Sequence, residues 1–140
     1  MARAIVSLGS NIEPRREYLA RAVSMLCGMP ETRLRQESDI EETAPVDVPA
    51  EFSRMKFLNQ LAVFDTDLEV HEFSRRMHSI EDALGRVRTV RNGPRTIDID
   101  LIDFDGLRLD EPALTLPHPR AARRDFVMRP LASLAPDVSF

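Results

Sequence analysis

The sequence predicts an α+β fold of the ferredoxin-like type, with a βαββαβ core whose two helices cover one face of an antiparallel sheet. Three observations support this prediction. Short β-branched and apolar runs, typical of strands, alternate with two longer segments in which apolar residues recur at helical spacing. Their order is strand, helix, strand, strand, helix, strand, followed by a C-terminal extension. The 140 residues show no repeat, low-complexity stretch or linker, so we expect one domain spanning residues 1–140.

The first part of the chain is expected to contain a strand, a helix and a second strand. Residues 4–8 form a β-branched run that stops at Gly9, which predicts a strand. Pro14 stands where helices often begin, and a helix is expected from about residue 14 to residue 28. Its apolar face would consist of Leu19, Ala22, Val23 and Leu26. Residues 32–43 alternate weakly, and we interpret them as an exposed strand.

The middle of the chain combines a long loop with a strand and a helix. Residues 44–56 contain two prolines and several polar residues, which indicates a loop of the length that often carries function. Residues 57–64 form an apolar run that predicts the third strand. Asp65 or Asp67 is expected to cap the next helix, which Gly85 would end. The apolar stripe of this helix would consist of Phe73, Met77, Ile80 and Leu84.

The last part of the chain supplies the fourth strand and the extension. The fourth strand is expected at residues 96–104, after a basic loop. Residues 104–109 indicate a hairpin turn, and a short helix is expected around residues 128–134.

The composition argues against several functional classes. The chain carries a net charge of −4, which disfavours a surface built for nucleic acid. Its lone cysteine, Cys27, lies in an apolar helical pattern and is expected to be a small buried residue in a reducing compartment. We see neither a signal peptide nor a run long enough to span a membrane. We therefore expect a cytoplasmic monomer that binds neither nucleic acid nor membrane.

Two carboxylates interrupt the fourth predicted strand at Asp98 and Asp100. Because side chains alternate along a strand, Ile97, Ile99 and Leu101 would face the helices and both aspartates the opposite side. The aspartates could form a solvated polar stripe, which is the more common arrangement for such a pair alone. They could also hold a hard cation such as Mg²⁺, which takes carboxylate and phosphate oxygens as ligands.

The surroundings of the aspartates favour the metal. Four arginines stand between residues 86 and 95, and Gly93-Pro94 forms the turn into the strand. These arginines could simply be solvated and paired with acidic residues. Next to two carboxylates, however, arginine forks suit the oxygens of a magnesium-bound polyphosphate. The four are Arg86, Arg88, Arg91 and Arg95.

The three histidines have plain structural explanations as well as functional ones. His118 lies between two prolines, which restrict its backbone and suit a phosphate ligand as well as a packing residue. His71 and His78 belong to the second predicted helix. We expect His71 to face solvent and His78 to lie where it could reach the edge of a pocket.

One segment of the chain, "GPRTIDIDLI", carries the two aspartates and the turn before them. It is closely similar to the signature of the 6-hydroxymethyl-7,8-dihydropterin pyrophosphokinase family of folate biosynthesis, and the motifs of the chain resemble those of that family. Further similarity, in matching order and spacing, comes from "VSLGSN", "ETAPV", "FLNQLAVF", "IEDALGRVR", "LPHPR" and "RDFVMRPLASLAP".

The resemblance implies an activity and a set of nucleotide-binding residues. The family has a ferredoxin-like core and transfers diphosphate from ATP, its co-substrate, to the hydroxymethyl group of the pterin, releasing AMP with the help of two Mg²⁺ ions. By this resemblance Asp98 and Asp100 would hold both ions and, with Arg86 and Arg95, form the catalytic set. The ATP site would comprise His78, Glu81, Arg86, Arg88, Arg95, Leu101, Thr115 and His118.

The resemblance also implies a pterin site. Two aromatic rings would enclose the flat pterin, and an amide with loop backbone groups would bind its polar edge. These residues would be Thr43, Pro45, Val46, Phe57, Asn59, Arg124 and Phe126. Asn59 has the clearest signal of its own, because it is polar within an apolar strand and its amide needs partners if buried.

Two alternatives to an active enzyme stay open from the sequence. The chain could be a ferredoxin-like module that binds a nucleotide or an anion, or a degenerate, inactive member of the family. An RNA-binding sheet is disfavoured by the acidic total and by the lack of an aromatic pair on a central strand.

Overall fold

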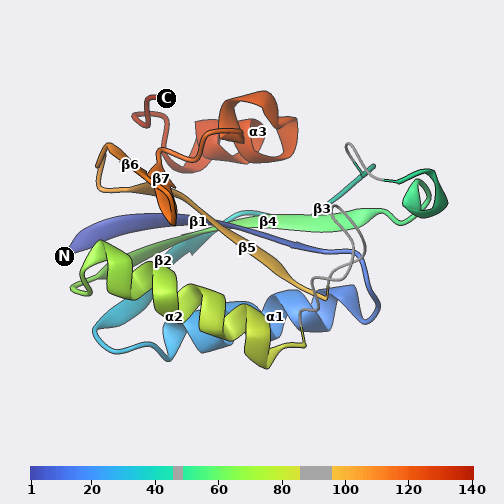
Figure 1. The fold of residues 1–140 in the computed structure, drawn as a ribbon, viewed down its shortest axis with the longest axis horizontal. Helices are drawn as coiled ribbons and strands as arrows, with labels where there is room; N and C mark the ends of the chain where they lie inside the picture. Colours follow the sequence, from blue (N-terminus) through green and yellow to red (C-terminus); the bar gives the residue numbers. More distant parts are fainter. Residues whose placement is uncertain (46–48, 86–95) are drawn as a thin grey trace.

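Strand β1 (Ala2–Ser10) lies inside an antiparallel sheet, because β4 (Phe57–Thr66) and β5 (Asp98–Phe104) pair with it on either side. The computed structural model describes residues 1–45, 49–85 and 96–140. Strand β2 (Thr32–Glu37) pairs with β4 and gives the order β2-β4-β1-β5, with β5 at one edge (Figure 1). The predicted ferredoxin-like arrangement of strands and helices is confirmed.

Helices cover both faces of this sheet. Helices α1 (Arg15–Cys27) and α2 (Val70–Ala83) lie on one face, as predicted (Figure 1). Their buried side chains pack against residues of the sheet such as Val6, Leu8, Phe64 and Ile99. Helix α3 (Asp125–Leu134) packs on the opposite face over Ile5, Leu61, Val63 and Ile102. The C-terminal extension thus supplies a second, smaller core.

Three details differ from the predictions. The strand predicted at residues 32–43 is interrupted, and β3 (Glu41–Thr43) pairs separately with β4. At the interruption the Leu61 N–H donates to the Ser38 hydroxyl, 2.9 Å away, so a side chain replaces a backbone partner. The cap of α2 is Glu69 and neither Asp65 nor Asp67, because β4 continues to Thr66 and only then turns. Cys27 is only half-buried.

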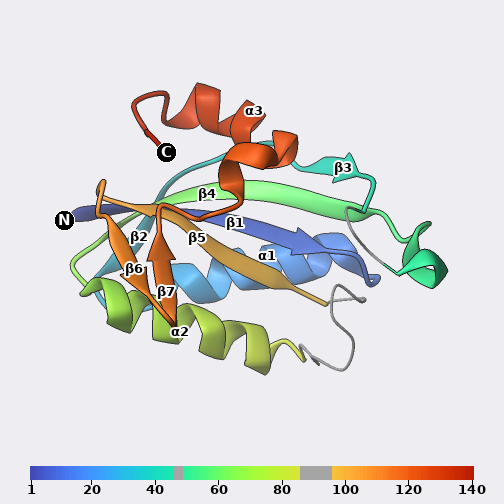
Figure 2. The same ribbon diagram turned by 45° about the horizontal axis from the view of Figure 1, so that its top comes forward.

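The chain after β5 also differs from expectation. The turn at Asp105 and Gly106 is present, but it does not join two paired strands. The hairpin is formed instead by β6 (Leu109–Glu111) and β7 (Leu114–Leu116), beside the main sheet (Figure 2). Helix α3 begins three residues earlier than predicted. Short 3-10 turns occur at Ala50–Phe52 and Ala121–Arg123.

Side-chain alternation gives the sheet one face toward α1 and α2 and a second face toward α3. Ile97, Ile99 and Leu101 are buried in the core with α1 and α2, as predicted, so Asp98 and Asp100 point to the face that carries α3. In the described parts of the chain, no helix has the length and apolar character needed to cross a membrane.

Candidate active site on the α3 face of the sheet

Three residues form a row across neighbouring strands on the α3 face. Gly9 of β1 pairs with Asn59 of β4 on one side and with Asp98 of β5 on the other. Partners opposite each other in an antiparallel sheet project to the same face. The amide predicted to bind the pterin and a carboxylate predicted to bind metal therefore face the same space.

Gly9 leaves room in the middle of this row. A Cβ atom at this position would lie 3.1 Å from Asn59 Oδ1 and 3.4 Å from Phe57 Cδ1. The first distance is shorter than ordinary van der Waals contact, so a side chain here would press on the amide. Gly9 was not among the predicted site residues, although it stands in the "VSLGSN" motif.

Arg124 and His118 of the C-terminal extension reach the sheet at Asp100. Its Oδ2 accepts a hydrogen bond from Arg124 Nη1 at 3.4 Å, and its Oδ1 lies 3.7 Å from His118 Nε2. Both distances are long for polar contacts to a carboxylate, so these contacts are weak enough to be exchanged for a ligand. The carboxylate is 28% exposed, which leaves it open to solvent. Asp98 is partly exposed as well.

His118 is held in one orientation by its own backbone and by the next turn. Its N–H donates to the Ile102 carbonyl at 2.9 Å, which attaches this segment to β5. Its Nδ1 lies 3.2 Å from the Arg120 N–H and accepts a hydrogen bond from it. The Nε2 side of the ring is then the side directed at Asp100. The structure thus places this predicted phosphate ligand beside the predicted metal ligand.

Glu81 of α2 lies on the face of the sheet opposite to the one toward which the two aspartates point. Its side chain is 2% exposed; one oxygen accepts from the Ile99 N–H at 2.8 Å and the other lies 2.8 Å from His78 Nδ1. Ile99 stands between the two aspartates on the edge strand. Glu81 therefore fixes the backbone that carries them, in addition to any role toward nucleotide.

A cavity of about 220 Å³ opens beside β5. The hairpin β6–β7 forms one of its walls through Leu114 and Thr115. Four of the residues predicted to bind ATP line it, together with Asp100 and several apolar side chains: His78, Leu101, Thr115 and His118. Its volume is below the range of sites for drug-sized ligands, so it suits one ring of a nucleotide rather than the whole molecule.

A charged cluster attaches this hairpin to α2. His71 Nδ1 lies 2.6 Å from Glu69 Oε1, and its Nε2 lies 2.9 Å from Glu111 Oε2 in β6. The hydrogen bond with Glu69, followed by that with Glu111, raises the pKa of His71 above its ordinary value. The same contact lowers the pKa of Glu69. His71 is half-exposed, in agreement with its predicted position toward solvent.

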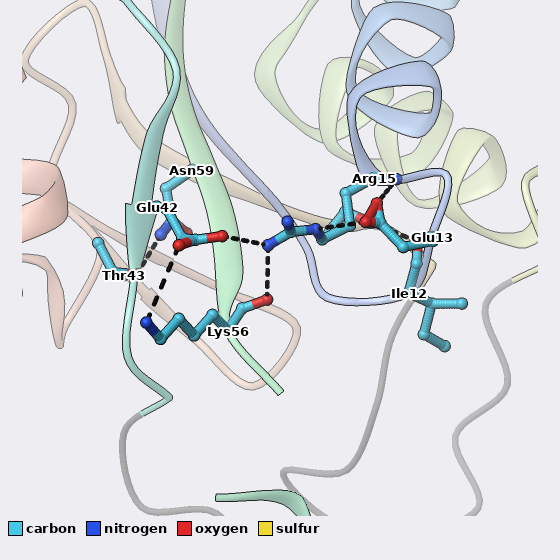
Figure 3. Close-up of polar contacts among 8 residues, drawn as sticks. Ile12, Glu13, Arg15, Glu42, Thr43, Lys56 and Asn59 are labelled. Atoms are coloured by element: carbon cyan, nitrogen blue, oxygen red, sulfur yellow. Dashed lines mark hydrogen bonds and ion pairs between the residues drawn. The ribbon is translucent and has the colours of Figure 1, made fainter. Parts of the chain in front are cut away.

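Three of the predicted pterin residues, Thr43, Phe57 and Asn59, lie together at the β4 end of the row. The Asn59 amide nitrogen donates to the Thr43 hydroxyl, and Thr43 pairs with Phe57 in the register of β3 and β4 (Figure 3). Arg124, just before α3, has its guanidinium 5.7 Å from the centre of the Phe126 ring. The two aromatic residues lie on different elements, β4 and α3. Their enclosure of a pterin stays a prediction.

Part of the predicted site falls in segments that the structure does not describe. Val46 of the pterin set lies outside the described residues, and so do the arginines of the basic loop with Asn92, Gly93 and Pro94. The roles predicted for Arg86, Arg88, Arg91 and Arg95 are therefore neither supported nor opposed by geometry.

The donor set fits a hard cation that shares its ligands with a substrate. Within residues 1–45, 49–85 and 96–140, no group of three or more His, Cys, Asp or Glu side chains could hold a metal. Asp98 and Asp100 would supply two carboxylates from one strand. Mg²⁺ commonly takes one or two carboxylates and completes its shell with water and phosphate oxygens.

Comparisons with known proteins agree on one family. A family model described as 7,8-dihydro-6-hydroxymethylpterin-pyrophosphokinase matches residues 5–136. A 2-amino-4-hydroxy-6-hydroxymethyldihydropteridine pyrophosphokinase of Methylorubrum extorquens is 41% identical over 99% of this chain and 85% of its own length. The protein of the same name from Pseudomonas aeruginosa is 40% identical over 97% of this chain and 82% of its own length.

A solved structure supports the fold. The chain resembles an HPPK-DHPS crystallised with substrates, with a TM-score of 0.72 at 13% identity. The match covers 99% of this chain and 41% of that longer chain. At this identity the likeness concerns the fold alone.

Proposed function

Because the chain belongs to the 7,8-dihydro-6-hydroxymethylpterin-pyrophosphokinase family, we propose that its α3 face transfers diphosphate from ATP to the hydroxymethyl group of 6-hydroxymethyl-7,8-dihydropterin. The protein is an ATP-dependent pyrophosphokinase of folate biosynthesis that acts on small-molecule substrates. We assign each part of the reaction to particular residues of this face.

The row of Asn59, Gly9 and Asp98 is the observation that carries this proposal. It joins an amide able to bind the polar edge of a pterin to a carboxylate able to bind metal. The ring would lie over Gly9 with its hydroxymethyl group directed toward β5. Phe57 and Phe126 would contact its faces, and Thr43 and Pro45 its edge. Arg124 would approach the phosphate groups from the start of α3.

The nucleotide would enter from the β5 edge. Its adenine would occupy the cavity lined by Leu101 and Thr115, with His78 and Glu81 beside it. His118 would then meet a phosphate oxygen next to Asp100. From the basic loop, Arg86, Arg88 and Arg95 would neutralise the remaining charge. Val46 would complete the pterin edge.

We propose that Asp98 and Asp100 would hold two Mg²⁺ ions together with the bound nucleotide. When bound, the ions would neutralise phosphate charge and hold the phosphate chain in place. The contribution of the chain itself is position and charge, which supply most of the catalysis in phosphoryl transfer.

The transfer breaks one bond and forms another. The alcohol oxygen of the pterin bonds to the β-phosphorus of ATP, and the bond from that phosphorus to the oxygen bridging to the α-phosphorus breaks. AMP leaves with that oxygen, and the alcohol proton passes to solvent. We assign no side chain as its base.

The nucleotide product tests this reaction. The chain is incubated with ATP, Mg²⁺ and the reduced hydroxymethylpterin, and the products are separated. AMP is expected; ADP would indicate an ordinary kinase, and the absence of turnover would contradict an active enzyme. Nucleotide binding that persists unchanged in EDTA, without turnover, would favour the alternative of a binding module.

A further inference from the structure

Arg15, the first residue of α1, links strand β3 to the start of β4. Its Nη1 donates to Glu42 Oε2 at 2.9 Å and to the Lys56 carbonyl oxygen at 3.2 Å, and its Nε donates to Glu13 Oε2 at 3.1 Å (Figure 3). Glu42 belongs to β3, and Lys56 immediately precedes β4. One side chain of α1 therefore contacts both β3 and the residue that precedes β4.

The cross-link lies on the reverse side of the proposed pterin site. Thr43 follows Glu42 in β3 and pairs with Phe57, the first residue of β4. Glu42 projects to the opposite face from Thr43, because its register partner Leu58 is buried in the core with α1 and α2. Arg15 thus cannot touch a pterin bound on the α3 face. Any effect it has on that ligand must pass through the two strands.

Strand β3 needs a support of this kind. It has only three residues, and such a short strand has few backbone hydrogen bonds to hold its register. A planar guanidinium offers several donors in a fixed geometry, which suits the joining of a carboxylate to a carbonyl oxygen. Arg15 is also partly shielded from solvent, with its side chain 21% exposed. The hydrogen bond with Glu42 is the main cause that raises its pKa.

The same cluster does not suit an anion site. A cavity of about 430 Å³ lies beside it, lined in part by Arg15 and Arg16. The carboxylates of Glu13 and Glu42 line it too, and they would repel a phosphate group. The ammonium group of Lys56 already lies 4.0 Å from Glu42. The charges of the cluster balance one another, as expected of a structural link.

We propose that Arg15 is a positioning residue for the pterin half of the active site. It fixes Thr43 and Phe57 relative to each other and to Asn59 by holding β3 and the start of β4 against α1. The inference rests on the proposed function, since it assumes that these three residues bind the pterin. It requires the affinity for the pterin to depend on Arg15 and the affinity for ATP not to.

Steady-state kinetics of AMP release by the full chain test the proposal, with pterin and ATP varied in turn. Arg15→Ala is expected to raise the KM for the pterin about tenfold, the scale of loss when a binding group is misplaced. The KM for ATP is expected to stay unchanged. The pterin KM of Arg15→Lys should lie between those of wild type and Arg15→Ala. A lysine ammonium can reach Glu42, but it lacks the forked guanidinium that also reaches the Lys56 carbonyl.

Two further variants serve as matched comparisons. Arg21→Ala removes an exposed pair with Glu17 on the same helix, 3.0 Å long, and should leave both KM values unchanged. Glu42→Ala should raise the pterin KM as much as Arg15→Ala does. The double variant should raise the pterin KM no further than either single variant, because both substitutions break the same contact.

Amide hydrogen exchange supplies a second measurement that needs no turnover. The amides of Glu41–Thr43 should exchange faster in Arg15→Ala than in wild type, and at the wild-type rate in Arg21→Ala. An unchanged pterin KM or unchanged exchange in Arg15→Ala would overturn the inference, as would an equal rise in the KM for ATP. A wild-type chain that releases no AMP contradicts the proposed function instead. Exchange and calorimetric binding of the pterin then decide the role of Arg15.

Discussion

Glu81 accepts a hydrogen bond from the Ile99 N–H, 2.8 Å away, at the point of the edge strand that separates Asp98 from Asp100. Because β5 has no strand on its outer side in the described sheet, this carboxylate serves where a neighbouring strand would otherwise pair. This hydrogen bond therefore connects helix α2 to the backbone that positions Asp98 and Asp100.

Replacing Glu81 should destabilise the protein. Glu81→Ala leaves the buried Ile99 N–H without this acceptor, which costs about 1–3 kcal/mol in free energy of unfolding. Glu81→Gln keeps an oxygen for Ile99 and should cost less. Asp82→Ala, at the exposed neighbouring position, should change stability by no more than about 0.5 kcal/mol. Urea denaturation of the three variants measures these differences, and equal stability of Glu81→Ala and wild type would refute the connection.

Removing the charge of either aspartate should slow turnover strongly and preserve the fold. Asp98→Asn and Asp100→Asn are expected to slow AMP release at least about a hundredfold, because charge stabilisation at the phosphates is lost. Thermal stability should stay the same or rise slightly, since two carboxylates on residues whose Cα atoms lie roughly 7 Å apart no longer repel each other. Asp110→Asn, at an exposed position of β6, is the control. Unfolding of either active-site variant would indicate a structural role for the aspartates.

A single methyl group at Gly9 should weaken pterin binding. In Gly9→Ala the new Cβ would lie 3.1 Å from Asn59 Oδ1, so the amide must move away from its position. The KM for the pterin is expected to rise and the KM for ATP to stay unchanged. Gly28→Ala is a suitable control, because Gly28 has helical backbone angles and its nearest neighbour would be 3.5 Å away. Equal pterin KM values in Gly9→Ala and Gly28→Ala would show that pterin binding does not depend on the space beside Gly9.

The cluster of His71, Glu69 and Glu111 should make stability depend on pH. The folded-state pKa of His71 is raised, so its contribution is present below its ordinary pKa of 6.5 and is lost as the pH rises through the higher folded value. The pKa of Glu69 is lowered from 4.5, so the pair weakens again in acid. The stability difference between wild type and His71→Ala should therefore be largest between about pH 5 and pH 6.

Urea midpoints measured from pH 4 to pH 9 check this dependence, roughly the range that spans both titrations. Glu111→Gln keeps the contact between His71 and Glu69 and should show an intermediate dependence. A difference between wild type and His71→Ala that does not vary with pH would exclude protonation of His71 as its cause.

The parts of this structure that the sequence predicted are those governed by local spacing. Phe73, Met77 and Ile80 recur at helical spacing and are buried, and Asp98 and Asp100 alternate with buried apolar residues as a strand requires. These patterns need no knowledge of the rest of the chain.

The parts that the sequence did not predict depend on contacts between distant segments. The hydroxyl of Ser38 replaces a backbone partner of Leu61, 23 residues away, and so interrupts a strand that otherwise looks continuous. Arg15 meets Glu42 across 27 residues, and no local pattern joins them. The strands of the β6–β7 hairpin have three residues each, too few for a periodic signal. The space at Gly9 becomes visible only once its register with Asn59 is known.

The row of Asn59, Gly9 and Asp98 also fixes the distance between the amide at one end and the carboxylate at the other. Its length is two steps between neighbouring strands, about 10 Å in total, and backbone hydrogen bonds set each step. Rotation of side chains can adjust the two ends but cannot change the number of steps. An alcohol whose reactive carbon lies closer to its recognised edge than in the pterin, or farther from it, would miss the phosphates however well its ring fits. Selection by length would then come from the sheet itself, and a change of substrate would require new side chains at both ends.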